Sequence, residues 1–154
     1  MKVDLNADVG ESYGRYTLGL DEELIPLISS ANIACGFHAG DPVVLEKTVG
    51  ICEKAGTAIG AHPGFPDLQG FGRRNMNLSP KEVKAMMLYQ IGAADAFLHK
   101  NGGKLQHVKP HGALYNMAAK DESLAKAICE AVLEYDKSLI ILAQSSGALY
   151  KEAV

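Results

Sequence analysis

The chain has 154 residues, of which 47% are hydrophobic and 21% are charged, so it has the size and composition of one globular domain with a substantial core. Its formal net charge of -3, with acidic and basic residues interspersed, gives no reason to expect nucleic acid or an anionic membrane as a partner. The first residues resemble a strand rather than a leader, and no apolar run approaches the roughly 20 residues of a membrane helix, so we expect a cytoplasmic protein.

The first third of the chain predicts two strands and two helices. Residues 3–8 alternate apolar and polar side chains, as a half-buried strand does. Asp21 begins a helix with an acidic first turn. The expected buried stripe of that helix consists of Leu24, Ile25, Leu27 and Ile28. A second strand is expected over 31–35, and Asp41, followed by proline, is a strong N-cap signal for the next helix.

The remaining sequence repeats this alternation. A third strand is expected over 57–61, and the capping box at 79–82 begins a long helix that ends at the glycines of 101–103. Strands four and five are expected over 105–109 and 138–143, with an apolar-striped helix between them. The last residues look like the start of another strand-to-helix loop.

Five strands that alternate with helices predict a mainly parallel sheet in a single β/α domain over residues 1–154. The pattern is typical of a β/α barrel and of an open doubly wound sheet. Both architectures place their active sites beyond the carboxyl ends of the strands. The loops that follow the strands are therefore where candidate functional residues are sought.

One carboxylate and three imidazoles come at the ends of four different strands: Asp8, His38, His62 and His111. In a parallel sheet these ends meet at one edge, so we expect the side chains to converge. Such a set can bind a divalent cation, or act without metal as bases and orienting acids. The structural alternative is that a histidine only satisfies loop backbone. Asp8 is the preferred carboxylate and Glu11 the next, because acids are unusual at the end of a core strand.

The loop within 58–74 combines glycine and proline with charged residues more densely than any other segment. Asp67 and the adjacent Arg73 and Arg74 are candidates for gripping a carboxylate or phosphate, although paired arginines are also common as solvated or partner-facing residues. Lys109 could hold an anionic substrate, against the alternative of an ordinary strand-end lysine.

Other polar residues are interpreted as structural. His99 falls in a helix and His107 within a strand. Cys35 closes an apolar strand and is interpreted as packing, and the three cysteines form no C-x-x-C pair, which favours reduced thiols. The sequence has no G-x-x-x-x-G-K-[ST] motif, so a Walker-type nucleotide site is absent.

Four segments carry a family resemblance. They are DLNADVGES (4–12), ANIACGFHAGD (31–41), GAHPGFPD (60–67) and VKPHGALYN (108–116). In these motifs and their order the chain resembles the LamB/YcsF family, whose bacterial members look like the A subunit of ATP-dependent 5-oxoprolinase. The resemblance implies a protein that works with B and C subunits to open 5-oxo-L-proline to L-glutamate while ATP is hydrolysed.

The resemblance also implies an irregular β/α barrel of the glycoside hydrolase/deacetylase type. In metal-dependent deacetylases of that superfamily an aspartate and two histidines hold the cation, which would correspond to Asp8, His62 and His111 here. Family members continue through further strands and helices, so this chain is expected to be about the first two-thirds of a family-length barrel. A longer chain or a second chain would complete the sheet.

The expected mechanism follows from this resemblance. His62 and His111 would move protons, and Asp8 would orient them or a metal. Substrate contacts are expected from His38, Glu11, Asp67, Arg73, Arg74 and Lys109. ATP would be a co-substrate, with a divalent metal present as its magnesium complex or in the site. The partners would be 5-oxo-L-proline and the B and C subunits, and self-association is left open.

Two other interpretations remain open. One is a metal-dependent carbohydrate hydrolase or deacetylase, which would turn over without ATP and lose activity on chelation. The other is a ligand-binding or assembly subunit that carries out no chemical step itself.

Overall fold

The computed structural model describes residues 2–154. In chain order its elements are β1 (Asn6–Val9), α1 (Asp21–Leu24), the 3-10 helix η1 (Ile25–Leu27), β2 (Ser30–Ala34), α2 (Pro42–Ala55), β3 (Ala58–His62), α3 (Pro80–His99), β4 (His107–Val108), α4 (Gly112–Ala118), α5 (Glu122–Tyr135), β5 (Ile140–Ile141) and α6 (Ala148–Ala153). The predicted alternation of strands and helices is confirmed.

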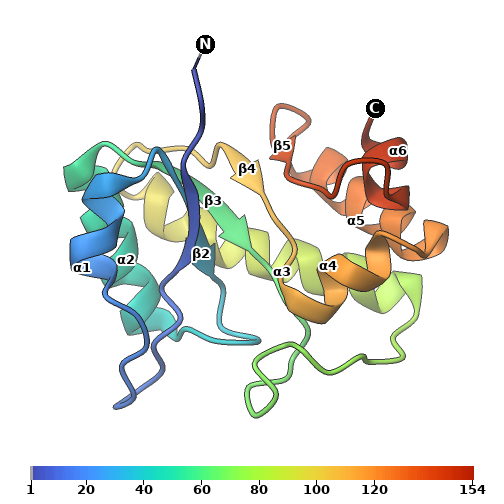
Figure 1. Ribbon diagram of the computed structural model, residues 1–154, viewed down its shortest axis with the longest axis horizontal. Coiled ribbons are helices and arrows are strands. Elements are labelled where there is room, and N and C mark those ends of the chain that lie inside the picture. The colour runs from blue at the N-terminus through green and yellow to red at the C-terminus, as the bar shows by residue number, and fades with distance from the viewer. Residues whose placement is uncertain (1) are drawn as a thin grey trace.

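The five strands form one parallel sheet in the order β1-β2-β3-β4-β5 (Figure 1). A doubly wound sheet reverses its strand order at a switch point, and this sheet does not. Each strand pairs with the next one in sequence, so the sheet winds in one direction. Within residues 2–154, β1 and β5 lie at opposite edges and do not pair with each other.

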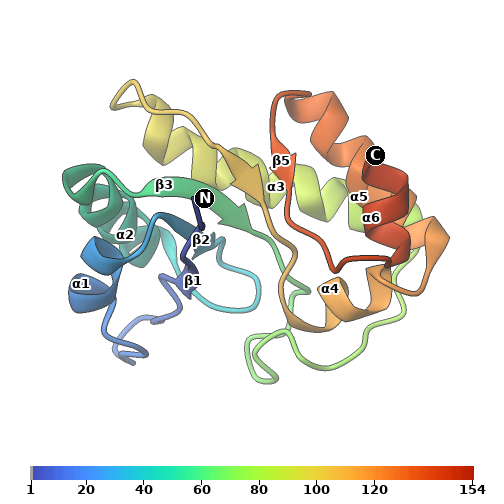
Figure 2. The same ribbon diagram turned by 45° about the horizontal axis from the view of Figure 1, so that its top comes forward.

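The two faces of the sheet differ in character. One face is apolar and buried, formed by Val9, Ala31, Ile33, Ile59, Ala61 and Val108. Helices α2 and α3 contact this side of β2 and β3, and α3 in turn packs against α5 (Figure 2). The opposite face is polar, formed by Asn6, Asp8, Ser30, Asn32, His62 and His107. Parallel strands usually carry apolar residues on both faces, so the polar face requires an explanation other than packing.

Strands β1, β4 and β5 are shorter than the patterns predicted, whereas β2 and β3 have the predicted length and are displaced by one residue. The first begins at Asn6 rather than at residue 3, and the Val3 side chain is 73% exposed. This segment lies at the edge of the sheet, where alternation alone does not create a partner. The fourth strand has only two residues, although beyond it the N–H groups of Lys109 and His111, on either side of Pro110, still donate to the Ala61 and Pro63 carbonyls.

The helix termini follow the predicted capping signals. Asp41 accepts hydrogen bonds from two N–H groups in the first turn of α2, and Gly56 ends that helix in the left-handed conformation at φ 72°. Ser79 and Glu82 form the complete capping box of α3. These signals act within a few residues, so they survive any tertiary arrangement.

One helical prediction was wrong, and one helix was not predicted. Leu27 was expected in a buried stripe but is 74% exposed, because the chain changes from α1 to a 3-10 helix at Ile25 and the tighter turn rotates Leu27 away from the core. Helix α4 was not predicted, because its start at Gly112 follows a proline and looks like a turn. Within residues 2–154, no helix is both long and apolar enough to cross a membrane.

Candidate functional site

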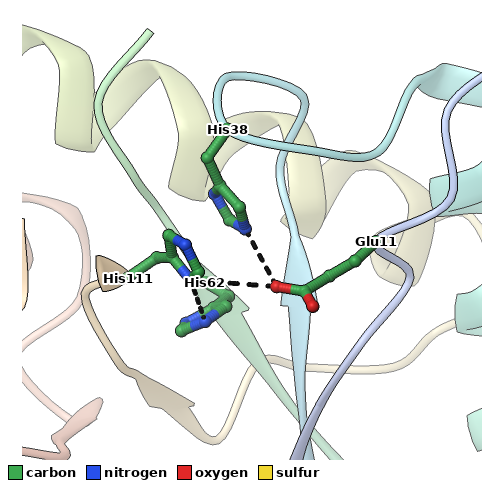
Figure 3. A group of neighbouring side chains, drawn as sticks. All are labelled: Glu11, His38, His62 and His111. Carbon is green, nitrogen blue, oxygen red and sulfur yellow. Dashed lines mark hydrogen bonds and ion pairs between the residues drawn. The ribbon is translucent and has the colours of Figure 1, made fainter. Parts of the chain in front are cut away.

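The candidate site lies where the loops after four strands meet, and it contains Glu11, His38, His62 and His111. Glu11 follows β1, His38 lies in the loop after β2, His62 is the last residue of β3, and His111 is the N-cap of α4 after β4 (Figure 3). One ligand atom from each residue lies within 4.8 Å of the others. We call this set the histidine cluster. The expected convergence of strand-end residues is therefore found.

The three imidazole rings are packed against one another. His38 and His111 stack with ring centroids 3.6 Å apart and an interplanar angle of 4°. The His62 ring stands perpendicular to both. All three rings are buried, whereas the Glu11 carboxylate is partly accessible and lies 3.2 Å from His38 Nε2 and 3.7 Å from His111 Nδ1 (Figure 3).

Close packing of the rings depends on glycine in the loop after β3. A side chain at Gly64 would place its Cβ 2.6 Å from His38 Nδ1. A side chain at Gly72 would place its Cβ 2.6 Å from the His38 Cβ and 2.8 Å from the His111 ring, and Gly72 also has φ +63°. Glycine at positions 64 and 72 therefore leaves the space in which the rings stack.

Backbone carbonyls fix the tautomers of two rings. His62 Nδ1 donates to the Lys109 carbonyl at 2.6 Å, and His111 Nε2 donates to the Phe71 carbonyl at 2.8 Å. A carbonyl oxygen can only accept, so in the neutral rings the other two nitrogens carry lone pairs. These nitrogens, His62 Nε2 and His111 Nδ1, face each other at 3.0 Å. Two facing lone pairs require a cation between or beside them, either a proton or a metal ion.

Burial favours the neutral forms of two of the imidazoles and of the Glu11 carboxyl group. Burial lowers the pKa of His38 to about 3 and that of His111 to about 4. Burial raises the pKa of Glu11 above its ordinary value. His38 Nδ1 is buried and has no hydrogen-bond partner among the described residues. Three imidazoles and a carboxyl group are a donor set that suits a transition-metal ion such as zinc, so the residues present fit a metal.

Asp8 lies beside the histidine cluster rather than within its tightest group. Its Oδ2 is 3.3 Å from His62 Nε2, and its Oδ1 accepts a hydrogen bond from Lys109 Nζ at 2.6 Å. Burial alone would raise the pKa of Asp8, but hydrogen bonds from His62, Lys109 and Asn32 outweigh it and hold that pKa well below its ordinary value. Asp8 is therefore an anion that faces His62. Of the expected trio Asp8, His62 and His111, the two histidines belong to the four-residue set of the cluster, in which Glu11 supplies the carboxylate.

The other predicted substrate contacts are divided by the structure. Asp67 is buried and forms a two-pronged ion pair with Arg74, whose Nε lies 2.9 Å and 3.1 Å from its two oxygens. This ion pair joins two parts of the loop after β3. Lys109 is likewise paired, with Asp8. Arg73 is exposed, lies over the Phe71 ring and makes no ion pair within residues 2–154. Among the predicted cationic residues, Arg73 is the one left for an incoming anion.

Sequence reasoning missed two residues near the site. Asn32 was not singled out, and His107 was interpreted as structural; both lie on the polar face and are hydrogen-bonded to one another. The available signal was Asn32 itself, a polar residue in the middle of an otherwise apolar buried strand. The interpretation of Cys35 as packing agrees with its burial, which raises the pKa of its thiol to about 12.

Fold and site together define an α/β protein whose winding parallel sheet presents a histidine and carboxylate cluster at the carboxyl ends of its strands. Residues 3–154 match the LamB/YcsF family, and the chain belongs to that family.

Similar proteins of known name cover nearly the whole chain. The A subunit of 5-oxoprolinase from Clostridium beijerinckii is 64% identical over 152 residues, which are 99% of this chain and 60% of that protein. The A subunit of 5-oxoprolinase from Pyrococcus furiosus is 59% identical over 142 residues, 92% of this chain and 56% of that protein. The crystal structure of the lactam utilization protein from Thermus thermophilus superimposes with a TM-score of 0.98 at 55% identity, over 99% of this chain and 62% of that one. The chain thus spans about 60% of the length of these relatives.

Proposed function

We propose that this chain belongs to an A subunit of ATP-dependent 5-oxoprolinase, a hydrolase that opens the lactam of 5-oxo-L-proline to L-glutamate together with B and C subunits. The observation that carries the proposal is the identity of 64% and 59% to proteins named as A subunits of 5-oxoprolinase, over nearly all of this chain. The histidine cluster supports it, because lactam hydrolysis needs groups that move protons.

The proposed chemistry begins from the low reactivity of the lactam. A five-membered lactam is an unactivated amide, so phosphorylation of its carbonyl oxygen by ATP would make water attack feasible at neutral pH. His62 and His111 would take and return the protons, since one proton shared between their facing nitrogens can be released in either direction. Asp8 would orient His62. Arg73 would hold the substrate carboxylate, because the alternatives Arg74 and Lys109 are already paired.

The proposal assigns nucleotide chemistry to the assembled enzyme. The sequence carries no Walker motif, so phosphorylation would need the partner subunits, with ATP bound as its magnesium complex. Such an enzyme would work in the cytoplasm, where ATP is available.

We also propose that residues 1–154 form one β/α domain of an irregular barrel of the glycoside hydrolase/deacetylase type. The sequential strand order supports this, since it is the order of a barrel wall. The polar face also supports it, because in a closed barrel this face would line the interior next to the site.

The test is glutamate release from 5-oxoproline by the full-length protein with its candidate B and C partners, with ATP and without it, and with each component omitted in turn. The proposal expects release only with ATP and only when the protein that contains this chain is present. Release that persists when that protein is omitted would contradict it. The alternative is a component that only binds ligand or partners. In that case, substitutions in the histidine cluster would reduce binding or assembly, and any complex that still formed would release glutamate.

A second candidate is a metal-dependent hydrolase or deacetylase acting on a carbohydrate. The observation that favours it is the convergence of ligand atoms from Glu11, His38, His62 and His111, which would hold the ion. A bound ion would supply Lewis-acid catalysis. Asp8 would then remain the anion that fixes His62. Turnover of an N-acetylated sugar without ATP, lost on chelation and restored by zinc, would favour this candidate over the lactam reaction.

A further inference from the structure

Two buried polar side chains lie near Asp8 on the polar face of the sheet. Asn32 is 0% exposed and His107 is 1% exposed. They come from β2 and β4, which β3 separates, and the ring of His107 crosses the intervening strand at Gly60. A side chain at Gly60 would place its Cβ 2.2 Å from that ring, so the glycine leaves the path that His107 needs to reach Asn32.

Hydrogen bonds fix the orientation of the Asn32 amide. Its Oδ1 accepts from His107 Nε2 at 2.7 Å and from Asn6 Nδ2 at 3.1 Å. Its Nδ2 donates to Asp8 Oδ1 at 2.7 Å and to Asn6 Oδ1 at 2.6 Å. Turning the amide over would set N–H groups against N–H groups and oxygen against the Asp8 carboxylate. All of these hydrogen bonds therefore require the same orientation of the Asn32 amide.

The Asp8 carboxylate, which can only accept, settles this orientation, and His107 then supplies the donor to Asn32 Oδ1. Asn32 Oδ1 can only accept, so His107 must carry its proton on Nε2. Burial lowers the pKa of His107 to about 4, which favours a neutral ring with a single proton at neutral pH. The Nδ1 atom of that ring then accepts, so the Gln106 side-chain amide, which lies 3.2 Å away, must turn its nitrogen toward it. A neutral ring with Nε2–H is the form that holds the amide nitrogen of Asn32 toward Asp8.

The consequence appears at Asp8. Its Oδ1 receives both Asn32 Nδ2 at 2.7 Å and Lys109 Nζ at 2.6 Å. With that oxygen held by two donors, Oδ2 is the oxygen presented to His62 Nε2. The carboxylate is thus fixed in rotation as well as in charge.

We propose that Asn32 and His107 are positioning residues, which act through Asp8 to hold His62 in the orientation that the reaction uses. This inference rests on the proposed function only for its kinetic readout. Removing a residue that orients a group in direct contact with the reacting centre typically lowers activity by about 10- to 100-fold.

The kinetic test uses the full-length protein assembled with its B and C partners. His107→Leu removes the donor, and His107→Gln replaces it with an amide N–H. Asn32→Asp keeps the shape but replaces the donor to Asp8 with an oxygen. His99→Gln, in the exposed last turn of α3, is the matched control. We expect kcat to fall about 10- to 100-fold for His107→Leu and Asn32→Asp with little change in KM, and to recover largely in His107→Gln.

A second readout does not depend on turnover. In full-length protein labelled with 15N-histidine, the ring nitrogen signals of His62 are expected to move in Asn32→Asp and His107→Leu and to stay in place in His99→Gln. If wild-type protein releases no glutamate while these signals move as expected, the proposed function fails and the positioning role stands. If both variants fold with unchanged His62 signals, or keep kcat within about twofold of wild type in an active complex, the positioning role is overturned.

Discussion

Asn32 and Ile33 are neighbours in β2, but they lie on opposite faces of the sheet and serve different ends. Ile33 is buried among apolar side chains under the helices, whereas Asn32 is buried in a hydrogen-bonded row that leads to Asp8 and His62. Both side chains are fully buried, but Ile33 has apolar neighbours and Asn32 has polar ones. Burial on the apolar face supports the fold, while burial on the polar face fixes the orientation of polar groups beside the histidine cluster.

The largest effect is expected on the polar face at His62. In the proposed enzyme, His62→Ala should reduce ATP-coupled glutamate release by about 10²- to 10⁴-fold, because it removes one of the two facing nitrogens proposed to move the protons. Circular dichroism and a thermal unfolding curve close to those of wild type would show that folding is retained. The matched control is His99→Ala on the exposed end of α3. Full activity of His62→Ala would remove this residue from the mechanism.

On the apolar face, Ile33→Ala should lower the free energy of unfolding by about 2–5 kcal/mol, because it leaves a cavity under α2 and α3. Urea unfolding of the full-length protein measures this. Folded Ile33→Ala should keep its kcat, in contrast to Asn32→Asp. A kcat loss as large as that of Asn32→Asp would mean that the two faces are not separable in function.

Arg73 and Arg74 are adjacent in one loop but differ in their contacts, since only Arg74 is paired with Asp67. In the proposed enzyme, Arg73→Ala should raise KM for 5-oxoproline about 10- to 100-fold, since Arg73 would form a charge-assisted hydrogen bond to the substrate carboxylate that contributes about 1.5–3 kcal/mol. Arg74→Ala removes the partner of buried Asp67 and should mainly make the loop easier to cleave in limited proteolysis. Equal KM effects from the two variants would argue against a separate role for Arg73.

The smallest effect is expected far from the polar face, at the start of α3. Ser79→Ala breaks the capping box with Glu82 and should lower the free energy of unfolding by about 1 kcal/mol without changing kcat or KM. Chemical denaturation and steady-state kinetics on the same preparation test both parts. A change in KM would show that the loop before α3 transmits strain to the site.

Much of the candidate site could be anticipated from the sequence, because a parallel sheet brings strand ends together regardless of detail. His38, His62 and His111 were expected to converge and do so. The division of the charged residues could not be anticipated. Whether Arg73 or Arg74 pairs with Asp67 depends on how the loop folds back, and spacing along the chain leaves both choices open.

By itself the sequence determined the features that arise within a few residues: the helix caps at Asp41 and Ser79, the helix end at Gly56, and the alternation of strands and helices. Their hydrogen bonds join near neighbours, so no distant contact is needed to specify them.

Only the tertiary structure decided which atoms face one another in the site. His62 and His111 are 49 residues apart, and His107 and Asn32 are 75 apart. The proton positions on these rings depend on which carbonyl or amide oxygen packing brings to each nitrogen, and that choice is made across the sheet rather than along the chain.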